Sequence, residues 1–214
     1  MNSQKLYSAA LVALGLILPL ALKAQIVPVL APGSTWEYTA VNPTGNASWS
    51  TSTGGWSEAP APFGNADASG WNGNTDFVPG TDWPNRSGLG DDLWLRRTID
   101  LTDIKLSTVN WGLGVDNGYK LYINGQFVAG DYQDGYASRW EYTGIFASSL
   151  LVQGTNVVAL ALDDNGGMTA FDMQVTGERI PLAAVPEPST YGLVGAAGLA
   201  ALVALRRRRA AKSA

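Results

Sequence analysis

The 214-residue chain contains no histidine and no cysteine, which excludes disulfides, thiol nucleophiles and histidine-dependent catalysis or metal binding. Its formal net charge is −4, yet residues 26–185 hold 17 acidic and 7 basic side chains, a net charge of −10. Because an acidic region repels phosphate groups, we expect no nucleic-acid partner.

Residues 1–24 have the composition of a secretory signal peptide. Lys5 supplies a positive charge, residues 6–22 form an apolar stretch, and the small residue Ala24 offers a cleavage point before Gln25. We therefore predict an N-terminal signal helix, export of the chain, and a folded domain over residues 25–180.

The first part of this domain is irregular. Residues 34–40 alternate as a strand around Trp36, but residues 42–90 show almost no periodicity and are rich in Gly, Pro, Asn and Ser. This second segment also carries four tryptophans: Trp49, Trp56, Trp71 and Trp83. Since large aromatic side chains bury much apolar area, we expect an ordered, loop-rich segment packed by its tryptophans.

A regular alternation of side chains between two faces becomes clear after residue 92. Residues 93–99, 109–115, 119–123 and 126–129 are predicted strands, and Asn124-Gly125 between the last two favours a tight hairpin because both residue types tolerate positive φ. The 93–99 strand has two distinct faces: Leu93, Leu95, Arg97 and Ile99 on one, and Trp94, Arg96 and Thr98 on the other.

Three further strands are predicted over residues 145–152, 156–162 and 171–175. The 156–162 strand is apolar on both faces, so we expect it in the centre of a sheet. The last strand should point Phe171, Met173 and Val175 inward, and Asp172 and Gln174 outward. Strands at this spacing predict an all-β fold, an antiparallel β-sandwich of the jelly-roll type with a long loop-rich N-terminal part.

Four segments of this region follow one another in a specific order: A-P-A-P-F-G (59–64), L-W-L-R-R-T-I-D-L (93–101), V-D-N-G-Y-K-L-Y-I-N-G-Q (115–126) and L-V-Q-G-T-N-V-V-A-L (151–160). Together they resemble the galactose-binding-like jelly-roll, in particular the sugar-binding domain of family 2 glycoside hydrolases. The resemblance covers residues 35–177 and implies a fold rather than an activity. The catalytic barrel of those hydrolases is absent, so we predict that this protein is not an enzyme.

The loop over residues 131–140 is the candidate carbohydrate site. Aromatic rings stack on the apolar face of a pyranose, and polar side chains hydrogen-bond its hydroxyls. The predicted binding residues are Asp131, Tyr132, Asp134, Tyr136, Arg139 and Trp140. Trp56, Trp71 and Trp83 are alternative platforms. The competing interpretation is that all these rings pack loops onto the sandwich.

Two acidic turns raise the question of a metal ion. Asp116-Asn117 and Asp163-Asp164-Asn165 offer the oxygen ligands that suit Ca²⁺, but such residues are also common in ordinary turns. We therefore predict no cofactor, with structural calcium as the alternative. Among the 17 acidic side chains, no pair stands out as the two carboxylates of a glycosidase.

Residues 181–214 form a linker followed by three consecutive parts. Pro186, Glu187 and Pro188 form a triplet, residues 189–205 form an apolar run, and residues 206–214 form a basic tail. The tail begins with four arginines: Arg206, Arg207, Arg208 and Arg209. The 17-residue run is at the lower limit for crossing a bilayer, and we predict a short transmembrane helix with the arginines on the cytoplasmic side.

This tail resembles the PEP-CTERM sorting signal of Gram-negative bacteria. The resemblance implies an exosortase-type membrane peptidase as a partner, cleavage near the triplet, and passage through the inner membrane to the cell surface or extracellular matrix. Combined with the sandwich, it predicts a non-catalytic envelope or matrix protein that binds polysaccharide. The alternatives are a structural or adhesive surface protein without a glycan site and, less favoured, a glycoside hydrolase.

Overall fold

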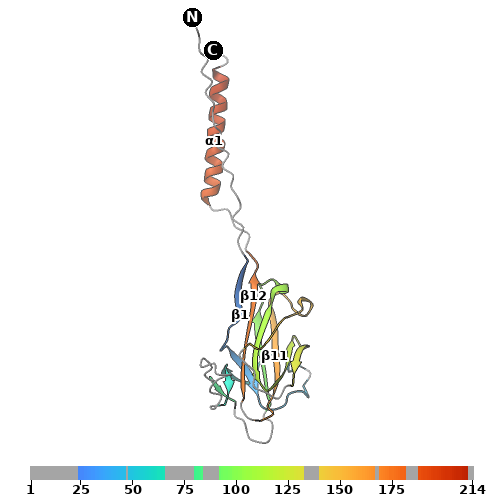
Figure 1. Ribbon diagram of the computed structural model, residues 1–214. Helices are drawn as coiled ribbons and strands as arrows, with labels where there is room; N and C mark the ends of the chain where they lie inside the picture. The colour runs from blue at the N-terminus through green and yellow to red at the C-terminus, as the bar shows by residue number, and fades with distance from the viewer. Residues whose placement is uncertain are drawn as a thin grey trace.

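The computed structural model describes residues 24–46, 48–65, 80–83, 92–132, 140–166, 169–181 and 188–211. The predicted signal peptide lies outside the described residues, apart from Ala24. The strands form two facing sheets, a β-sandwich, and a single long helix stands apart from it (Figure 1). The predicted all-β class is confirmed at this level.

The first sheet, sheet A, has the strand order β10-β7-β12-β4-β5, and β1 also pairs with β12. Its strands are β1 (Gln25–Leu30), β4 (Phe63–Gly64), β5 (Thr81–Asp82), β7 (Asn110–Asp116), β10 (Tyr142–Ile145) and β12 (Ala170–Arg179). The β4–β5 pair is parallel, and the other described pairs of this sheet are antiparallel. Because β12 pairs with β1 and with β7, it is the centre of sheet A.

The second sheet, sheet B, has the order β3-β2-β6-β11-β8-β9. Its strands are β2 (Thr35–Thr39), β3 (Ser57–Pro60), β6 (Leu93–Asp100), β8 (Gly118–Ile123), β9 (Gln126–Asp131) and β11 (Thr155–Asp163). The apolar strand β11 lies between β6 and β8, which confirms its predicted central position. Asn124 and Gly125 both have positive φ in the β8–β9 hairpin, as the sequence indicates.

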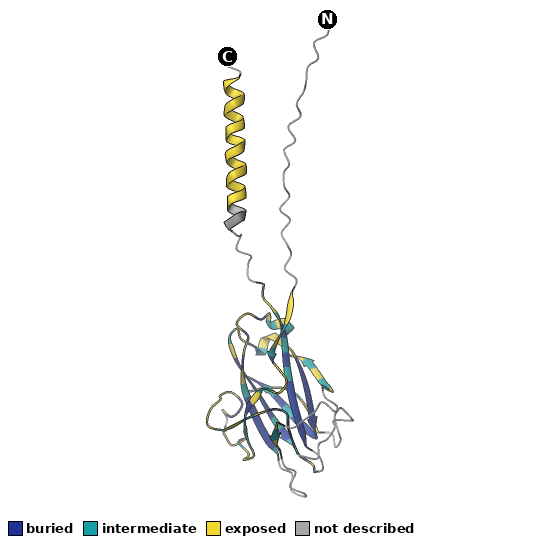
Figure 2. Cartoon of the chain, turned by 90° about the vertical axis from the view of Figure 1, so that its left-hand side faces the viewer, coloured by how far each residue is buried: buried dark blue, intermediate teal, exposed yellow. Residues whose placement is uncertain are grey.

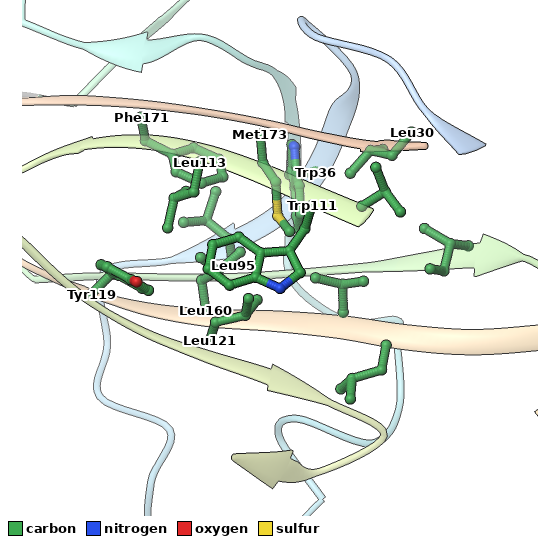
Figure 3. Close-up of a cluster of buried hydrophobic side chains, with 14 of the residues drawn as sticks. Leu30, Trp36, Leu95, Trp111, Leu113, Tyr119, Leu121, Leu160, Phe171 and Met173 are labelled. Atoms are coloured by element: carbon green, nitrogen blue, oxygen red, sulfur yellow. The ribbon is translucent and has the colours of Figure 1, made fainter. Parts of the chain in front are cut away.

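The core lies between the two sheets, where the alternating side chains of each strand meet (Figure 3). Trp36 of sheet B and Phe171 of sheet A meet edge to face across it, with ring centroids 5.4 Å apart. The predicted inward residues of β6, β11 and β12 are buried here: Leu93, Leu95, Ile99, Val158, Leu160, Leu162, Phe171, Met173 and Val175. Burying each such side chain stabilises the fold by about 1.5–3 kcal/mol.

Two predicted elements differ from the structure. The irregular segment 42–90 contains three short strands, β3, β4 and β5, which are too short to show a period of two. The predicted strand 145–152 is wrong: β10 ends at Ile145, and a 3₁₀ turn, η2 (Ser148–Leu150), follows. Phe146 and Leu151, which flank this turn, are both buried. The apolar residues of this run therefore anchor a turn to the core and do not form a strand. A second 3₁₀ turn, η1 (Leu106–Thr108), precedes β7.

Asp172 is also placed differently from the prediction. It points to the outer face of β12 as expected, but the residue is 0% exposed and is therefore shielded from solvent. Its Oδ1 accepts a hydrogen bond from the backbone N–H of Gly33 at 3.1 Å. Gly33 has a φ of +73° and lies in the connection between β1 and β2. This connection covers Asp172, which the local sequence around β12 cannot reveal.

The outer face of sheet B is covered by the described part of the segment between β2 and β3. Trp49 from this segment packs on Trp94 of β6 and meets Tyr122 of β8 edge to face at 5.3 Å. Arg96 of β6, 4% exposed, donates to the carbonyl groups of Trp49 at 3.3 Å and Gly54 at 2.5 Å. This segment is therefore ordered and packed by a tryptophan, as predicted.

The C-terminal helix α1 (Pro188–Ala210) makes no buried contact, since its described side chains are all exposed (Figure 2). The helix itself is therefore confirmed over the predicted residues 189–205. Within the described part of the chain, however, no helix combines the length and apolar character needed to cross a membrane. The predicted transmembrane assignment is corrected accordingly, and the reason is local: four arginines follow directly on a short, glycine-rich apolar run.

Candidate functional site

The two described ends of the 131–140 loop lie on different sides of the sandwich. Asp131 ends β9, and Tyr132 follows it with 57% of its surface exposed. The Nζ of Lys120, on the outward side of β8, lies 5.1 Å from the centroid of the Tyr132 ring. Tyr132 therefore belongs to the outer face of sheet B. Asp134, Tyr136 and Arg139 lie outside the described residues.

Trp140, at the other end of the loop, belongs to the outer face of sheet A. Its φ of +62° is rare for a residue with a large side chain, and its ring is partly buried. A Cβ atom built on Gly112 of β7 would stand 3.6 Å from Cε3 of Trp140. Because Trp111 and Leu113 point into the core, position 112 faces outward. The structure thus separates Trp140 from Tyr132, and the two rings do not form one platform.

Beside Trp140, the outer face of sheet A is hollowed into a groove of about 310 Å³. Two cross-strand rows line it. Thr143, Gly112 and Gln174 are directly paired across β10, β7 and β12. Ile145, Asn110 and Thr176 form the next row of the same face. The volume is at the lower end of the range of small-molecule sites, which suits a short stretch of a longer ligand.

At the floor of this groove, position 112 has no side chain, and the side chains of Gln174 and Trp140 occupy the space above it. A Cβ there would come within 3.2 Å of Nε2 of Gln174, so the Gln174 amide lies directly over the glycine. Asn110 donates through Nδ2 to the carbonyl of Thr108 at 2.7 Å, which holds its amide in place. The groove therefore presents two carboxamides and two threonine hydroxyls next to an indole ring, a set that hydrogen-bonds hydroxyl groups.

Tyr119 and Tyr142 close the edge of the sandwich between the two ends of the loop. Their ring centroids are 4.8 Å apart, one ring coming from β8 and the other from β10. Burial, the neighbouring Tyr142 and Asp131 raise the pKa of Tyr119 to about 12. Burial, Asp131 and Glu141 also raise the pKa of Tyr142. Both hydroxyls stay protonated under physiological conditions, and we assign Asp131 to this packed edge rather than to the groove.

A second hollow, of about 240 Å³, lies between β2 and β6 and contains opposite charges. Its main ion pair joins Nε of Arg96 to Oε2 of Glu37 at 2.9 Å. The guanidinium of Arg96 also lies 3.8 Å from the Trp56 ring centroid, and Glu37 accepts the N–H of Gly54. These groups are occupied with one another, which fits a structural role. Trp56 therefore packs the fold, and Trp83, 2% exposed, lies in the core.

The two acidic turns meet at one end of β7. Asp116 and Asp164 are both buried, and Oδ2 of Asp164 has no hydrogen-bond partner among the described residues. Burial, followed by the charge of Asp164, raises the pKa of Asp116 to about 6. Asn117 bridges the turns, donating to Asp116 at 2.8 Å and accepting from the N–H of Asn165 at 2.8 Å. Within the described ranges, no group of three or more acidic side chains is arranged to hold a metal.

The sorting residues lie at the two ends of α1. Pro188 is its first residue, while Pro186 and Glu187 lie outside the described residues. The arginines at the other end are all exposed: Arg206, Arg207, Arg208 and Arg209. Cations in the last turn of a helix interact favourably with its dipole, so the cluster also stabilises the helix end.

Residues 184–209 match the PEP-CTERM protein-sorting motif, which confirms the resemblance found in the tail. The motif implies processing by an exosortase, and proteins that carry it are exported and sorted to the cell surface. The match covers only the tail and leaves the family of the sandwich open. No curated protein matches the chain at a significant level.

Among solved structures, the chain is similar to a β-glucuronidase of an uncultured Clostridium species, with 10% identity and a TM-score of 0.47 over 76% of this chain. It is also similar to the β-glucuronidase of Ruminococcus gnavus in complex with D-glucuronic acid, with 12% identity and a TM-score of 0.45 over 72% of this chain. The chain spans 30% and 29% of the length of these two proteins.

Most of the groove could not be predicted from the sequence. Gly112 was visible as an outward glycine inside an alternating strand, a pattern that indicates close approach by a neighbour. The neighbour, Gln174, comes from a strand more than 60 positions later in the chain. The polar residues Asn110, Thr143 and Thr176 carry no signal of their own, because threonine and asparagine are ordinary on the outer face of a sheet.

Proposed function

We propose that this protein is a non-catalytic surface or matrix protein that binds polysaccharide in the groove on the outer face of sheet A. The observation that carries the proposal is the position of Trp140 beside two rows of uncharged hydrogen-bonding side chains on β10, β7 and β12. The exosortase sorting motif supports it, since a protein sorted to the cell surface meets extracellular polysaccharide.

The groove matches the chemistry of a sugar ring. A pyranose has an apolar face that packs on an indole, and hydroxyls at its rim that both donate and accept hydrogen bonds. Trp140 would provide the stacking surface, while Gln174, Asn110, Thr143 and Thr176 would bind the hydroxyls. Position 112 must lack a side chain for Gln174 and Trp140 to lie close to the sheet in the positions that the sugar would contact.

Several features support a binding role rather than hydrolysis. The residues that line the groove include no carboxylate, whereas glycosidases place two of them on either side of the scissile bond. Glu37 and Glu58 face each other across β2 and β3, but Glu37 is held by Arg96 and by the N–H of Gly54. That pair is therefore a poor acid and base.

Affinity electrophoresis of the purified full chain in gels that contain single polysaccharides tests this proposal. We expect retardation by at least one polysaccharide, lost in Gly112→Leu, which fills the groove floor, and at least tenfold weaker in Trp140→Ala. Phe127→Ala is the matched control, because Phe127 is an exposed aromatic residue on sheet B, 5.8 Å from the Tyr122 ring centroid. Melting temperatures of all variants separate lost binding from lost folding.

Uniform failure across the panel, or binding that Gly112→Leu leaves unchanged, would show that the groove has no such role. A structural or adhesive function without a glycan site would then be the better account. The sorting step has its own test: replacing residues 186–188 by alanines should leave an uncleaved precursor that retains a C-terminal tag. A tag that persists on the surface form of the unaltered protein would contradict cleavage.

A further inference from the structure

The groove has an apolar side chain at its rim, next to two carboxamides. Ile145, at the end of β10, is 63% exposed and lines the groove together with Asn110 and Gln174. We propose that the groove selects sugars that carry an acetamido group, whose methyl group packs on Ile145 and whose amide bonds to Asn110 and Gln174. This inference rests on the proposed function and adds the class of sugar. Three features of the groove lead to it.

The first feature is the hydrogen-bonding capacity that remains on the two side-chain amides. Asn110 uses Nδ2 to donate to the carbonyl of Thr108 at 2.7 Å, so its Oδ1 is left as an acceptor with a fixed direction. Within the described part of the chain, the Gln174 amide makes no side-chain hydrogen bond, although it lines the groove. The pair therefore offers one acceptor for an N–H group and one donor for a carbonyl oxygen.

The second feature is the spacing of these two amides. On the paired strands β7 and β12, Asn110 lies opposite Thr176, two positions from Gln174. Such diagonal neighbours are about 7–8 Å apart. The N–H and C=O of a trans acetamido group point in opposite directions, and with a hydrogen bond of about 2.9 Å at each end the arrangement spans about 8 Å. Asn110 and Gln174 can therefore bind the two ends of one acetamido group.

The third feature is the position of Ile145 beside Asn110. The two residues are directly paired across β10 and β7, so their Cβ atoms are about 4.5–5.5 Å apart on the same outer face. Trp140 lies at Gly112, which is two residues, or about 7 Å, along β7 from Asn110. A sugar ring stacked on Trp140 would direct an acetamido group along β7 toward Asn110 and place its methyl group against Ile145.

These features favour an acetamido group over a hydroxyl on the same ring carbon. A hydroxyl oxygen with a hydrogen bond on each side spans at most about 6 Å, so it satisfies only one of the two amides well. It also leaves Ile145 in water, whereas the acetamido methyl removes apolar surface from water. With an acetamido sugar in the groove, the hydroxyls of Thr143 and Thr176 would bind the hydroxyls of the ring.

Affinity electrophoresis of the full chain in glycol chitin and in hydroxyethyl cellulose tests the inference. Both polymers are neutral and soluble, they share the same linkage between sugars, and they differ chiefly in the group at C2, which is acetamido in the first and a hydroxyl in the second. We expect retention by glycol chitin to be at least tenfold stronger. Since neither polymer is charged, salt should leave this difference unchanged.

Two substitutions of exposed β-branched residues form a matched pair. Ile145→Thr removes the apolar rim and keeps a residue suited to a strand, so the preference for glycol chitin should fall at least threefold. Val152→Thr is the control, because Val152 is also exposed, at 54%, but does not line the groove, and the preference should stay as it is. Gln174→Glu replaces the amide donor with an acceptor and should weaken retention by glycol chitin at least tenfold. Melting temperatures show whether each variant remains folded.

The outcomes separate the two proposals. If no polysaccharide in the panel is retained, the proposed function itself is wrong, and the inference with it. If hydroxyethyl cellulose, or any polysaccharide without acetamido groups, is retained as strongly as glycol chitin, the protein still binds glycan and the acetamido selectivity is wrong. An equal loss of preference in Ile145→Thr and Val152→Thr contradicts it as well. Retention confined to polysaccharides with acetamido groups, and weakened by Ile145→Thr alone of the pair, supports the inference.

Discussion

Arg96 is the side chain on which the packing of the segment before β3 depends, and its replacement gives the sharpest test of the fold. The guanidinium makes an ion pair with Glu37, donates to the carbonyl groups of Trp49 and Gly54, and lies over the ring of Trp56. The Arg96→Met variant keeps most of the apolar stem and removes all four interactions. It also leaves Glu37 as a buried carboxylate without its cation.

The expected magnitude follows from the burial of the pair. The side chains of Arg96 and Glu37 are 5% and 13% exposed, so this pair belongs with buried rather than surface ion pairs. Removal of one partner from such a pair costs about 3–5 kcal/mol, most of it from the uncompensated charge that remains. The lost contact with Trp56 adds about 0.5–2 kcal/mol. We therefore expect Arg96→Met to lower the free energy of unfolding by about 5 kcal/mol.

A double-mutant cycle separates the charge effect from lost packing. Glu37→Gln alone should also destabilise the protein, but the double variant Arg96→Met/Glu37→Gln should be more stable than the sum of the single losses by about 2 kcal/mol, because no unpaired charge is left. Urea unfolding followed by tryptophan fluorescence measures all four proteins. A loss below about 1 kcal/mol in Arg96→Met, or strictly additive losses, would refute this reasoning.

Two further predictions concern other buried sites. The raised pKa of Asp116, about 6 against an ordinary value of 3.8, means that the folded protein binds an extra proton between these values, so stability falls as the pH rises from about 4 to about 6. The Asp116→Asn variant should lose this pH dependence when its unfolding is measured across the pH range. Its free energy of unfolding should rise by up to about 3 kcal/mol at pH 7. An unchanged pH profile would contradict this assignment. Gly144→Ala should lower stability by about 1–3 kcal/mol, because its Cβ would stand 2.6 Å from the Trp111 ring, whereas Gly45→Ala, with open space around it, should be neutral in the same thermal melts.

The regular part of the fold could be predicted because its side chains alternate strictly. β11 shows how far this goes: its inward residues, its outward residues and its central position all follow from seven letters of sequence. The pairing partners of β1, β4 and β5 could not be predicted in the same way. Two-residue strands have no period, and β1 is defined by hydrogen bonds to β12, about 150 positions away.

The candidate site shows a different limit. The sequence draws attention to Trp140, but it groups this residue with Tyr132 because the two are close in the chain. The loop runs from the edge of sheet B to the edge of sheet A, so its two described aromatic residues reach opposite outer faces. Proximity along the chain therefore says little about proximity in a loop that connects two sheets.

The groove instead joins residues by register. Thr143, Gly112 and Gln174 meet because β10, β7 and β12 pair in one fixed alignment, and a shift of one residue in any of them would turn its groove residues into the core. The buried neighbours Trp111, Leu113 and Met173 set that alignment by their size. The same alternation that builds the core therefore builds the groove on its other side, which ties the proposed recognition at this surface to the stability of sheet A.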